Sequence, residues 1–273
     1  MCRLALRAGR HSEVEQPGWV SRQAGLVRID YNQEARRYRA GREVPLEQIE
    51  PWRPAVNAFL RPGGEPILDV GAGTGLWTRA FATWFDVEMI ALEPSSGMRT
   101  VGTEIGLPPR ACYVAASAQH LPFSRPVFRA AWLSTVVHHL TDLSACAREL
   151  RSALVEGAPV MIRNSFPGRL DEVELFRHFP AAAAVAAHWP TLEHVVATFA
   201  ESGFTHHDFV TVREERWPDL EGVRHFAVTM RNTDSALAPI SDAEFADGLR
   251  NLDEAIARGE RPRPTGTDLV VLT

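Results

Sequence analysis

Short hydrophobic runs alternate with segments of helical periodicity through the middle of the chain. The runs at 66–70, 87–93, 111–116, 128–137 and 158–164 are too short for helices and predict buried strands. Several segments between them, such as 74–85 and 96–106, space their apolar residues as a helix does, and the segment after the fourth run predicts a helix capped by Thr141 and stopped at Gly157. Each crossover helix must cover one face of a parallel sheet. The pattern therefore predicts an α/β fold with a doubly wound sheet.

Two regions depart from this alternation. Residues 1–44 are rich in arginine and predict a leader that ends in a helical lid over the main domain, 45–273. Residues 165–202 follow the fifth strand and contain helical segments interrupted by prolines, so they predict a helical cap inserted into that domain. Apolar runs at 204–215 and 267–273 predict two more strands, which gives a sheet of seven.

Composition and charge exclude several classes of protein. With 45% hydrophobic and 23% charged residues, the 273-residue chain resembles an average globular protein. The formal charge of −5 provides no broad cationic surface for nucleic acid, and no apolar run is long enough to span a membrane or to act as a signal segment. Cys2, Cys112 and Cys146 have no metal-ligand spacing, so we expect reduced thiols, no metal and a cytoplasmic location, and we leave the oligomeric state open.

The stretch LDVGAGTG at 68–75 places three glycines directly after a predicted strand. Glycines at a turn between strand and helix let a ligand approach the backbone closely. A dinucleotide site needs the spacing G-x-G-x-x-G, and its third glycine would fall at Leu76. Asp69, just before the turn, would repel a pyrophosphate but attract an ammonium group. The stretch therefore favours a nucleoside with a cationic tail over a dinucleotide. The alternative that the protein is a dehydrogenase is supported by the glycines alone.

Glu93 ends the second predicted strand. A carboxylate at this position can accept hydrogen bonds from both hydroxyls of a ribose. The expected ligand is therefore a ribonucleoside.

Five motifs now stand in order along the chain: YNQEARRYRAGR at 31–42, LDVGAGTG at 68–75, ALEPS at 91–95, ASAQHLPF at 116–123 and WLSTVVHHL at 132–140. With them, residues 31–165 resemble the class I S-adenosylmethionine-dependent methyltransferases, in particular the small-molecule group of methyltransferase type 11 that includes ubiquinone and menaquinone biosynthesis enzymes. The resemblance implies a Rossmann-like sheet with an antiparallel last strand and S-adenosylmethionine as cofactor, with S-adenosylhomocysteine as its product.

The resemblance also assigns the cofactor-binding residues. It implies that Asp69, Gly71, Ala72, Gly73 and Gly75 hold the methionine part, that Glu93 holds the ribose, that Pro94, Met98, Ser117, Ala118 and Gln119 enclose the adenine, and that Ser134 passes beside the methionine. The family commonly has acidic residues where this chain has Ser117 and Gln119. A hydroxyl and an amide accept hydrogen bonds more weakly than carboxylates, so cofactor affinity is expected to be modest.

The lid and the end of the fourth strand supply further candidates. Tyr31, Tyr38 and Arg42 lie near one helical face, where Tyr38 and Arg42 are expected to contact the cofactor and Tyr31 the acceptor. Arg42 either pairs with the methionine carboxylate or forms a surface ion pair. His138 is the candidate general base, although adjacent histidines at this position also occur in the family without a catalytic role.

The acceptor side is defined less sharply by sequence. His139 is expected to face the acceptor, with Asn164, Arg169 and His178 at the start of the cap. The predicted function is methyl transfer to a small organic molecule, such as a specialised metabolite. The alternatives are a non-methylating catalyst, such as a cyclase, and a protein that binds the cofactor without turnover, because fold alone does not fix chemistry.

Overall fold

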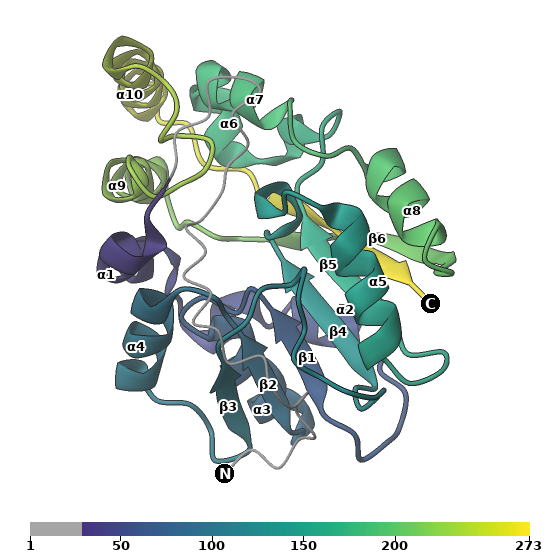
Figure 1. Cartoon of the computed structure of the whole chain (residues 1–273). Coiled ribbons are helices and arrows are strands. Elements are labelled where there is room, and N and C mark those ends of the chain that lie inside the picture. The colour runs from purple at the N-terminus through teal and green to yellow at the C-terminus, as the bar shows by residue number, and fades with distance from the viewer. Residues whose placement is uncertain (1–28) are drawn as a thin grey trace.

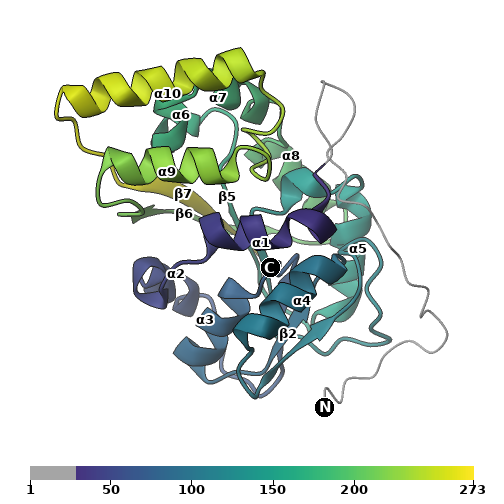
Figure 2. The ribbon, with the colours of Figure 1, turned by 90° about the vertical axis from the view of Figure 1, so that its left-hand side faces the viewer.

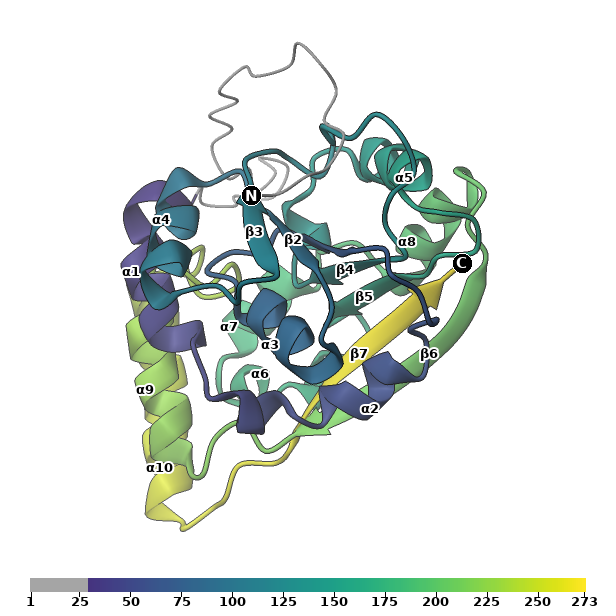
Figure 3. The ribbon, with the colours of Figure 1, turned by 90° about the horizontal axis from the view of Figure 1, so that it is seen from below.

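The computed structural model describes residues 29–273, which contain a seven-stranded sheet in the order β3-β2-β1-β4-β5-β7-β6 (Figure 1). Its strands are β1 (Ile67–Val70), β2 (Met89–Leu92), β3 (Ala111–Val114), β4 (Ala130–Ser134), β5 (Val160–Asn164), β6 (His206–Glu214) and β7 (Thr265–Leu272). In this sheet β7 runs antiparallel to its neighbours β5 and β6, while β1 to β5 pair in parallel (Figure 3). The predicted doubly wound sheet with an antiparallel last strand is confirmed. The expected leader over residues 1–28, with Cys2, lies outside the described residues.

Helices connect and cover these strands. They are α1 (Tyr31–Arg42), α2 (Trp52–Asn57), α3 (Leu76–Phe85), α4 (Ser96–Ile105), α5 (Leu143–Ala153), α6 (Glu174–His178), α7 (Pro180–Ala186), α8 (Leu192–Ala200), α9 (Leu220–Met230) and α10 (Asp242–Ala257), with short 3-10 turns at Leu46–Ile49, Val137–His139 and Leu170–Glu172. None of the helices within 29–273 is both long enough and apolar enough to cross a bilayer.

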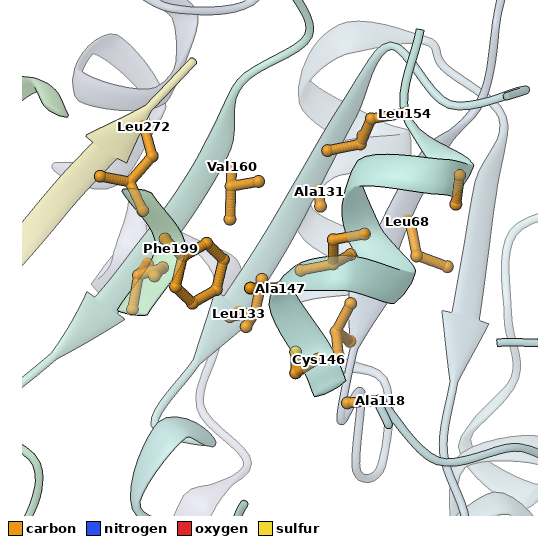
Figure 4. Close-up of a cluster of buried hydrophobic side chains, with 14 of the residues drawn as sticks. Leu68, Ala118, Ala131, Leu133, Cys146, Ala147, Leu154, Val160, Phe199 and Leu272 are labelled. Carbon is orange, nitrogen blue, oxygen red and sulfur yellow. The ribbon is translucent and has the colours of Figure 1, made fainter. Parts of the chain in front are cut away.

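Both faces of the sheet are apolar. Successive strand residues point to opposite sides, and hydrophobic residues of the central strands pack on each side. Leu68 and Leu133 join a core with α5 and α8, where Cys146 and Phe199 pack on the strands (Figure 4). The preceding residues, such as Trp132, face the other side and pack with α2 and α3. This second core holds a cluster of aromatic rings, which fixes the position of α3 directly behind the glycine turn.

The helices beyond β5 divide between two places. Helices α6, α7, α9 and α10 share a separate apolar core and form what we call the helical group, which lies at one end of the sheet (Figures 1 and 2). Helix α8 falls within the expected cap of 165–202, yet it packs against α5 on the sheet, because Val195 and Phe199 are buried there. The helical group therefore draws two of its helices from the segment between β6 and β7, which the cap expectation did not include.

Two local expectations differ from the structure. Asp142, and not Thr141, caps α5, because its carboxylate accepts the Ala145 backbone N–H at 2.8 Å. Thr141 is engaged with Gln119 instead. The helix ends at Ala153, before the expected stop at Gly157.

Candidate functional site

A pocket lies at the carboxyl ends of β1, β2 and β4, beneath α1 and beside the helical group. Of the residues expected to bind cofactor or acceptor, its wall contains Tyr31, Tyr38, Arg42, Gly71, Gly73, Glu93, Pro94, Met98, Ser117, Ala118, Gln119, Ser134, His138 and His139. Sequence reasoning did not identify the other wall residues, which are Thr135, Val136, Leu140, Thr141, Trp189, Thr233 and Ser235. The carboxyl edge of a parallel sheet is where open α/β folds bind ligands.

The glycine turn has a backbone that only glycine adopts readily. Gly71, Gly73 and Gly75 all have positive φ, at 70°, 56° and 83°. A Cβ on Gly71 would also stand 2.6 Å from Val136. At Gly73 the space on that side is open to the pocket, with Tyr38 as its nearest neighbour at 3.9 Å. The turn therefore brings bare backbone to the pocket wall before α3 begins.

Glu93 fastens this turn to the end of β2. One carboxylate oxygen accepts the Gly73 N–H at 2.9 Å and the other accepts the Ser95 N–H at 2.8 Å. Burial raises the pKa of Glu93, while these two backbone bonds oppose the rise. A carboxylate has more acceptor sites than these two bonds use, so Glu93, on the pocket wall, can still accept from ligand hydroxyls.

Asp69 lies beneath the turn and is only 1% exposed. Its carboxylate accepts the Thr78 hydroxyl at 2.6 Å, and burial raises its pKa to about 7. Asp69 is therefore engaged with α3 and is not on the wall of this pocket, and its expected contact with a ligand ammonium stays a prediction. Gly75 and Ala72 are also absent from this wall: Gly75 packs near Tyr113, and Ala72 lines a neighbouring cavity.

The part of the wall that is expected to enclose the adenine carries neutral side chains. The Gln119 amide donates to the Thr141 hydroxyl at 3.0 Å, and the Ser117 hydroxyl lies 3.4 Å from the His120 ring. Thr141 thus orients the amide that stands where the family commonly has glutamate. The sequence pattern marked Thr141 only as a helix cap and did not indicate its contact with Gln119.

Helix α1 contributes Tyr31, Tyr38 and Arg42 to the pocket wall. The Asn32 side chain accepts the Ser95 hydroxyl at 2.9 Å, which holds the start of α1 against the start of α4. Tyr31 meets the ring of Tyr38 edge-on at 5.8 Å and that of His139 at 5.7 Å. The Arg42 guanidinium forms an ion pair, at 2.6 Å, with Asp234, which lies on the loop between α9 and α10. An ion pair was one of the two roles expected for Arg42, but at the surface, whereas this pair is partly buried. Arg42 also lines the pocket.

His138 and His139 also belong to the pocket wall. The His138 Nε2 lies 3.0 Å from the Ser235 hydroxyl, and its ring stacks on Trp189. Burial and the neighbouring His139 hold the pKa of His138 well below its usual value, and burial lowers the pKa of His139 to about 4. Both rings are therefore neutral at pH 7, and a neutral imidazole can accept a proton or a hydrogen bond.

Three expected acceptor residues do not reach this pocket. Arg169 pairs with Asp268 at 2.9 Å and donates to Thr211 on β6, also at 2.9 Å. His178 is buried in the helical group, where its ring lies 3.2 Å from a Glu174 oxygen. Asn164 is fully buried at the end of β5 and donates to the neighbouring backbone. These side chains contact other groups of the protein, which local sequence could not reveal.

Within residues 29–273, no group of three or more His, Cys, Asp and Glu side chains is arranged to hold a metal ion. The pocket does fit an adenosine with an amino-acid tail. The glycine turn leaves open space at Gly73, Glu93 provides unfilled acceptor sites, and the buried Nε of Arg42 has no partner among the described residues. Together with the strand order, these features define a nucleoside-binding domain of the class I methyltransferase type.

Comparison with known proteins gives the same family. Residues 67–157 match a family described as a methyltransferase domain. The chain is 33% identical over 125 residues to the demethylmenaquinone methyltransferase of Thermobifida fusca, an alignment that covers 44% of this chain and 52% of that enzyme. The chain thus spans about half or less of the curated relatives it matches. Residues 67–157 are thus similar to the methyltransferase domain of the class I S-adenosylmethionine-dependent methyltransferases, and the comparisons support that family for this domain.

Solved structures share the fold over more of the chain. A protein of Anabaena variabilis described as a methyltransferase from an antibiotic biosynthesis pathway matches with a TM-score of 0.65 and 18% identity, over 83% of this chain and 97% of that one. The cyclase SpnF matches with a TM-score of 0.59 and 15% identity, over 89% of this chain and 93% of that one. Other structures of this fold hold S-adenosylmethionine or S-adenosylhomocysteine, and S-adenosylmethionine is the cofactor of the family.

Proposed function

We propose that this protein transfers a methyl group from S-adenosylmethionine to a small organic molecule. The observation that carries the proposal is a single pocket with two chemically different walls. One wall has the glycine turn and Glu93, which suit the nucleoside, and the other has His138, Trp189 and Ser235, which suit an acceptor. A reaction between two ligands requires that both be held side by side in this way.

The chain's residues would have distinct tasks in that reaction. S-adenosylmethionine supplies, when bound, a methyl group on a positively charged sulfur. Glu93 and the Gly73 backbone would hold the nucleoside, and α1 with the helical group would exclude water. His138 is neutral and can accept a proton from an acceptor hydroxyl, with Ser235 and Trp189 fixing the ring. Its lowered pKa makes it a weak base, which favours an acidic acceptor such as a phenol over an alcohol.

The position of the pocket between α1, β4 and the helical group supports a small acceptor. Its acceptor wall is formed by β4, by Trp189 after α7 and by the loop after α9, so a polymer would have to pass under the lid. The formal charge of −5 does not favour nucleic acid. We further propose that the acceptor is a specialised metabolite and that the protein acts in the cytoplasm.

A non-methylating catalyst is the second candidate, because the cyclase SpnF has the same fold. A protein that only binds the cofactor is the third. All three would bind S-adenosylhomocysteine, so binding alone does not separate them. Only methyl transfer leaves S-adenosylhomocysteine as a product and adds one CH₂ to the mass of an acceptor.

The first experiment is calorimetric titration with S-adenosylhomocysteine, S-adenosylmethionine and NAD. We expect binding of the two sulfur nucleosides and none of NAD, with a loss in Glu93→Ala. The protein would then be incubated with S-adenosylmethionine and a library of small phenols, carboxylic acids and amines, and products sought by the mass of one added CH₂. Absence of nucleoside binding would refute the proposal, and turnover of a compound without that mass change would favour the cyclase-like alternative.

A further inference from the structure

A second cavity adjoins the pocket on the side of β5 and β6. The two share Tyr38, Arg42, Gly71, Ser134 and Thr135 on their walls. The second cavity adds Arg163 from β5 with Glu214 and Arg216 from β6 and the residues just after it. Three guanidinium groups therefore border one cavity next to the proposed acceptor position.

Arg163 has hydrogen-bond donors that the described residues leave largely unused. It is 8% exposed, and its contacts with the Ser134 hydroxyl and a Glu214 oxygen are both 3.4 Å long. Its buried Nε has no partner among residues 29–273. The faces of the guanidinium lie over Trp52 and Trp77, at 4.9 and 5.3 Å from the ring centroids. These rings pack against the guanidinium, and Arg163 is one of the residues on the cavity wall.

Arg216 has no hydrogen bond or ion pair within the part of the chain that the structure describes. Its guanidinium lies over the rings of Trp217 and Phe226, at 4.9 and 4.6 Å. Burial and the nearby Arg42 lower its pKa to about 9, against the opposing effect of Glu214. Arg216 is half-buried, and a partly desolvated cation without an anionic partner favours a ligand that brings one.

The charges around the cavity are not balanced by the protein. Arg42 is paired with Asp234, which leaves Glu214 as the one carboxylate on the cavity wall for Arg163 and Arg216. Glu214 also accepts the indole N–H of Trp52. S-adenosylmethionine is itself a net cation, with a sulfonium and an ammonium against one carboxylate. Binding it nearby would increase the positive excess, and an anionic acceptor would offset that excess.

We propose that Arg163 and Arg216 bind an anionic group, a carboxylate or a phosphate, of the molecule on which the enzyme acts. This inference rests on the proposed function and narrows its substrate class. The cofactor's own carboxylate is the other possible source of the anion. The glycine turn borders the same cavity through Gly71, Ala72 and Thr74, so the test must distinguish the two sources. Arg42, which borders both cavities, is better placed for the cofactor carboxylate.

The test compares cofactor binding with anion binding in Arg216→Gln and Arg163→Gln. Arg250→Gln, at a 66% exposed side chain on α10, is the matched control. Calorimetry would first measure S-adenosylhomocysteine and 5′-methylthioadenosine, which lacks the amino-acid part and its carboxylate. The protein saturated with S-adenosylhomocysteine would then be titrated with inorganic phosphate, diphosphate and benzoate.

We expect at least one of these anions to bind the wild-type complex. Its affinity should fall about 10-fold or more in each variant, because a charge-assisted hydrogen bond is lost. Affinity for both nucleosides should stay unchanged. Thermal unfolding would verify that the variants are folded, and if Arg163→Gln is not, the more exposed Arg216→Gln alone decides the result.

Two results would overturn the inference while leaving the proposed function intact. One is a loss of S-adenosylhomocysteine affinity in the variants with 5′-methylthioadenosine unaffected, which would assign the arginines to the cofactor carboxylate. The other is a wild-type complex that binds none of the anions, or binds them equally well in the variants. A wild-type protein that binds no S-adenosylhomocysteine would instead refute the proposed function, and this inference with it.

Discussion

The imidazole of His138 lies flat on the indole of Trp189, with ring centroids 4.1 Å apart and planes 9° from parallel. The stack joins the end of β4 to the residue that follows α7, so it places the helical group against the proposed reaction centre. It also shields the imidazole from water, which favours its neutral form.

Removing the indole should therefore raise the pKa of His138. In Trp189→Ala, water can reach the ring, and the pKa should move up toward 6.5 from its strongly lowered value. In Trp189→Phe, an aromatic ring still covers the imidazole and the pKa should stay low. NMR titration of the His138 ring measures both, and an equal pKa in wild type and Trp189→Ala would contradict the shielding argument.

The role of His138 as a base can be tested separately. His138→Ala should lower kcat by roughly 10² or more on an acceptor whose proton must be removed, because that is the usual contribution of a general base. Affinity for S-adenosylhomocysteine should change little. Unaltered turnover in this variant, with an acceptor found by the mass screen, would remove His138 from the mechanism.

His139 should make the folded protein less stable in acid. Its pKa is about 4 in the folded state and about 6.5 in an unfolded chain, so the unfolded state binds more protons between these values. Stability attributable to His139 is fully present above pH 6.5 and is lost as the pH falls toward 4. Urea unfolding of His139→Gln at a series of pH values should show a shallower loss over this window. An identical slope in wild type and variant would mean that His139 does not titrate in this way.

Glu93 should affect cofactor binding through two backbone bonds as well as through direct contact. Glu93→Gln replaces one accepting oxygen with a donor, so the bond to Gly73 or to Ser95 is lost. We expect S-adenosylhomocysteine affinity to fall by roughly 10-fold or more. Glu254→Gln, at an exposed position on α10, is the matched control. Equal affinities in the two variants would show that Glu93 is not part of the nucleoside site.

Features that depend on adjacent residues could be predicted from the sequence, and contacts that depend on the tertiary fold could not. Glu93 and the glycine turn could be predicted, because a strand end and a left-handed turn are local properties that a few adjacent residues determine. Trp189 and Ser235 could not, since they reach His138 only through the packing of the helical group, far away in the sequence.

The same division explains the misplaced acceptor residues. Arg169 and His178 are polar residues at the start of a predicted cap, and nothing near them in the sequence indicates their partners. Arg169 pairs with Asp268, and His178 lies beside Glu174. Long-range pairing of charged side chains depends on the tertiary fold, which a local pattern does not contain.

The contact between α1 and α4 yields the last prediction. Gly97, in the first turn of α4, lies directly against Asn32 of the lid, and a Cβ there would stand 2.3 Å from the Asn32 carbonyl oxygen. Backbone cannot yield as a flexible side chain does, so Gly97→Ala should push α1 away from α4. The hydrogen bond from the Ser95 hydroxyl to Asn32 should be lost at the same time.

A displaced lid should expose the pocket without unfolding the sheet. In Gly97→Ala, we expect faster hydrogen exchange over residues 31–42 and weaker S-adenosylhomocysteine binding, while exchange in β1 and β4 stays as in wild type. Gly64→Ala is the matched control, because a Cβ at Gly64 meets no atom within 4 Å. If Gly97→Ala binds the nucleoside as tightly as Gly64→Ala while its lid exchanges faster, then α1 covers the pocket without contributing to cofactor affinity. If neither quantity changes, the close contact with Asn32 does not hold the lid in place.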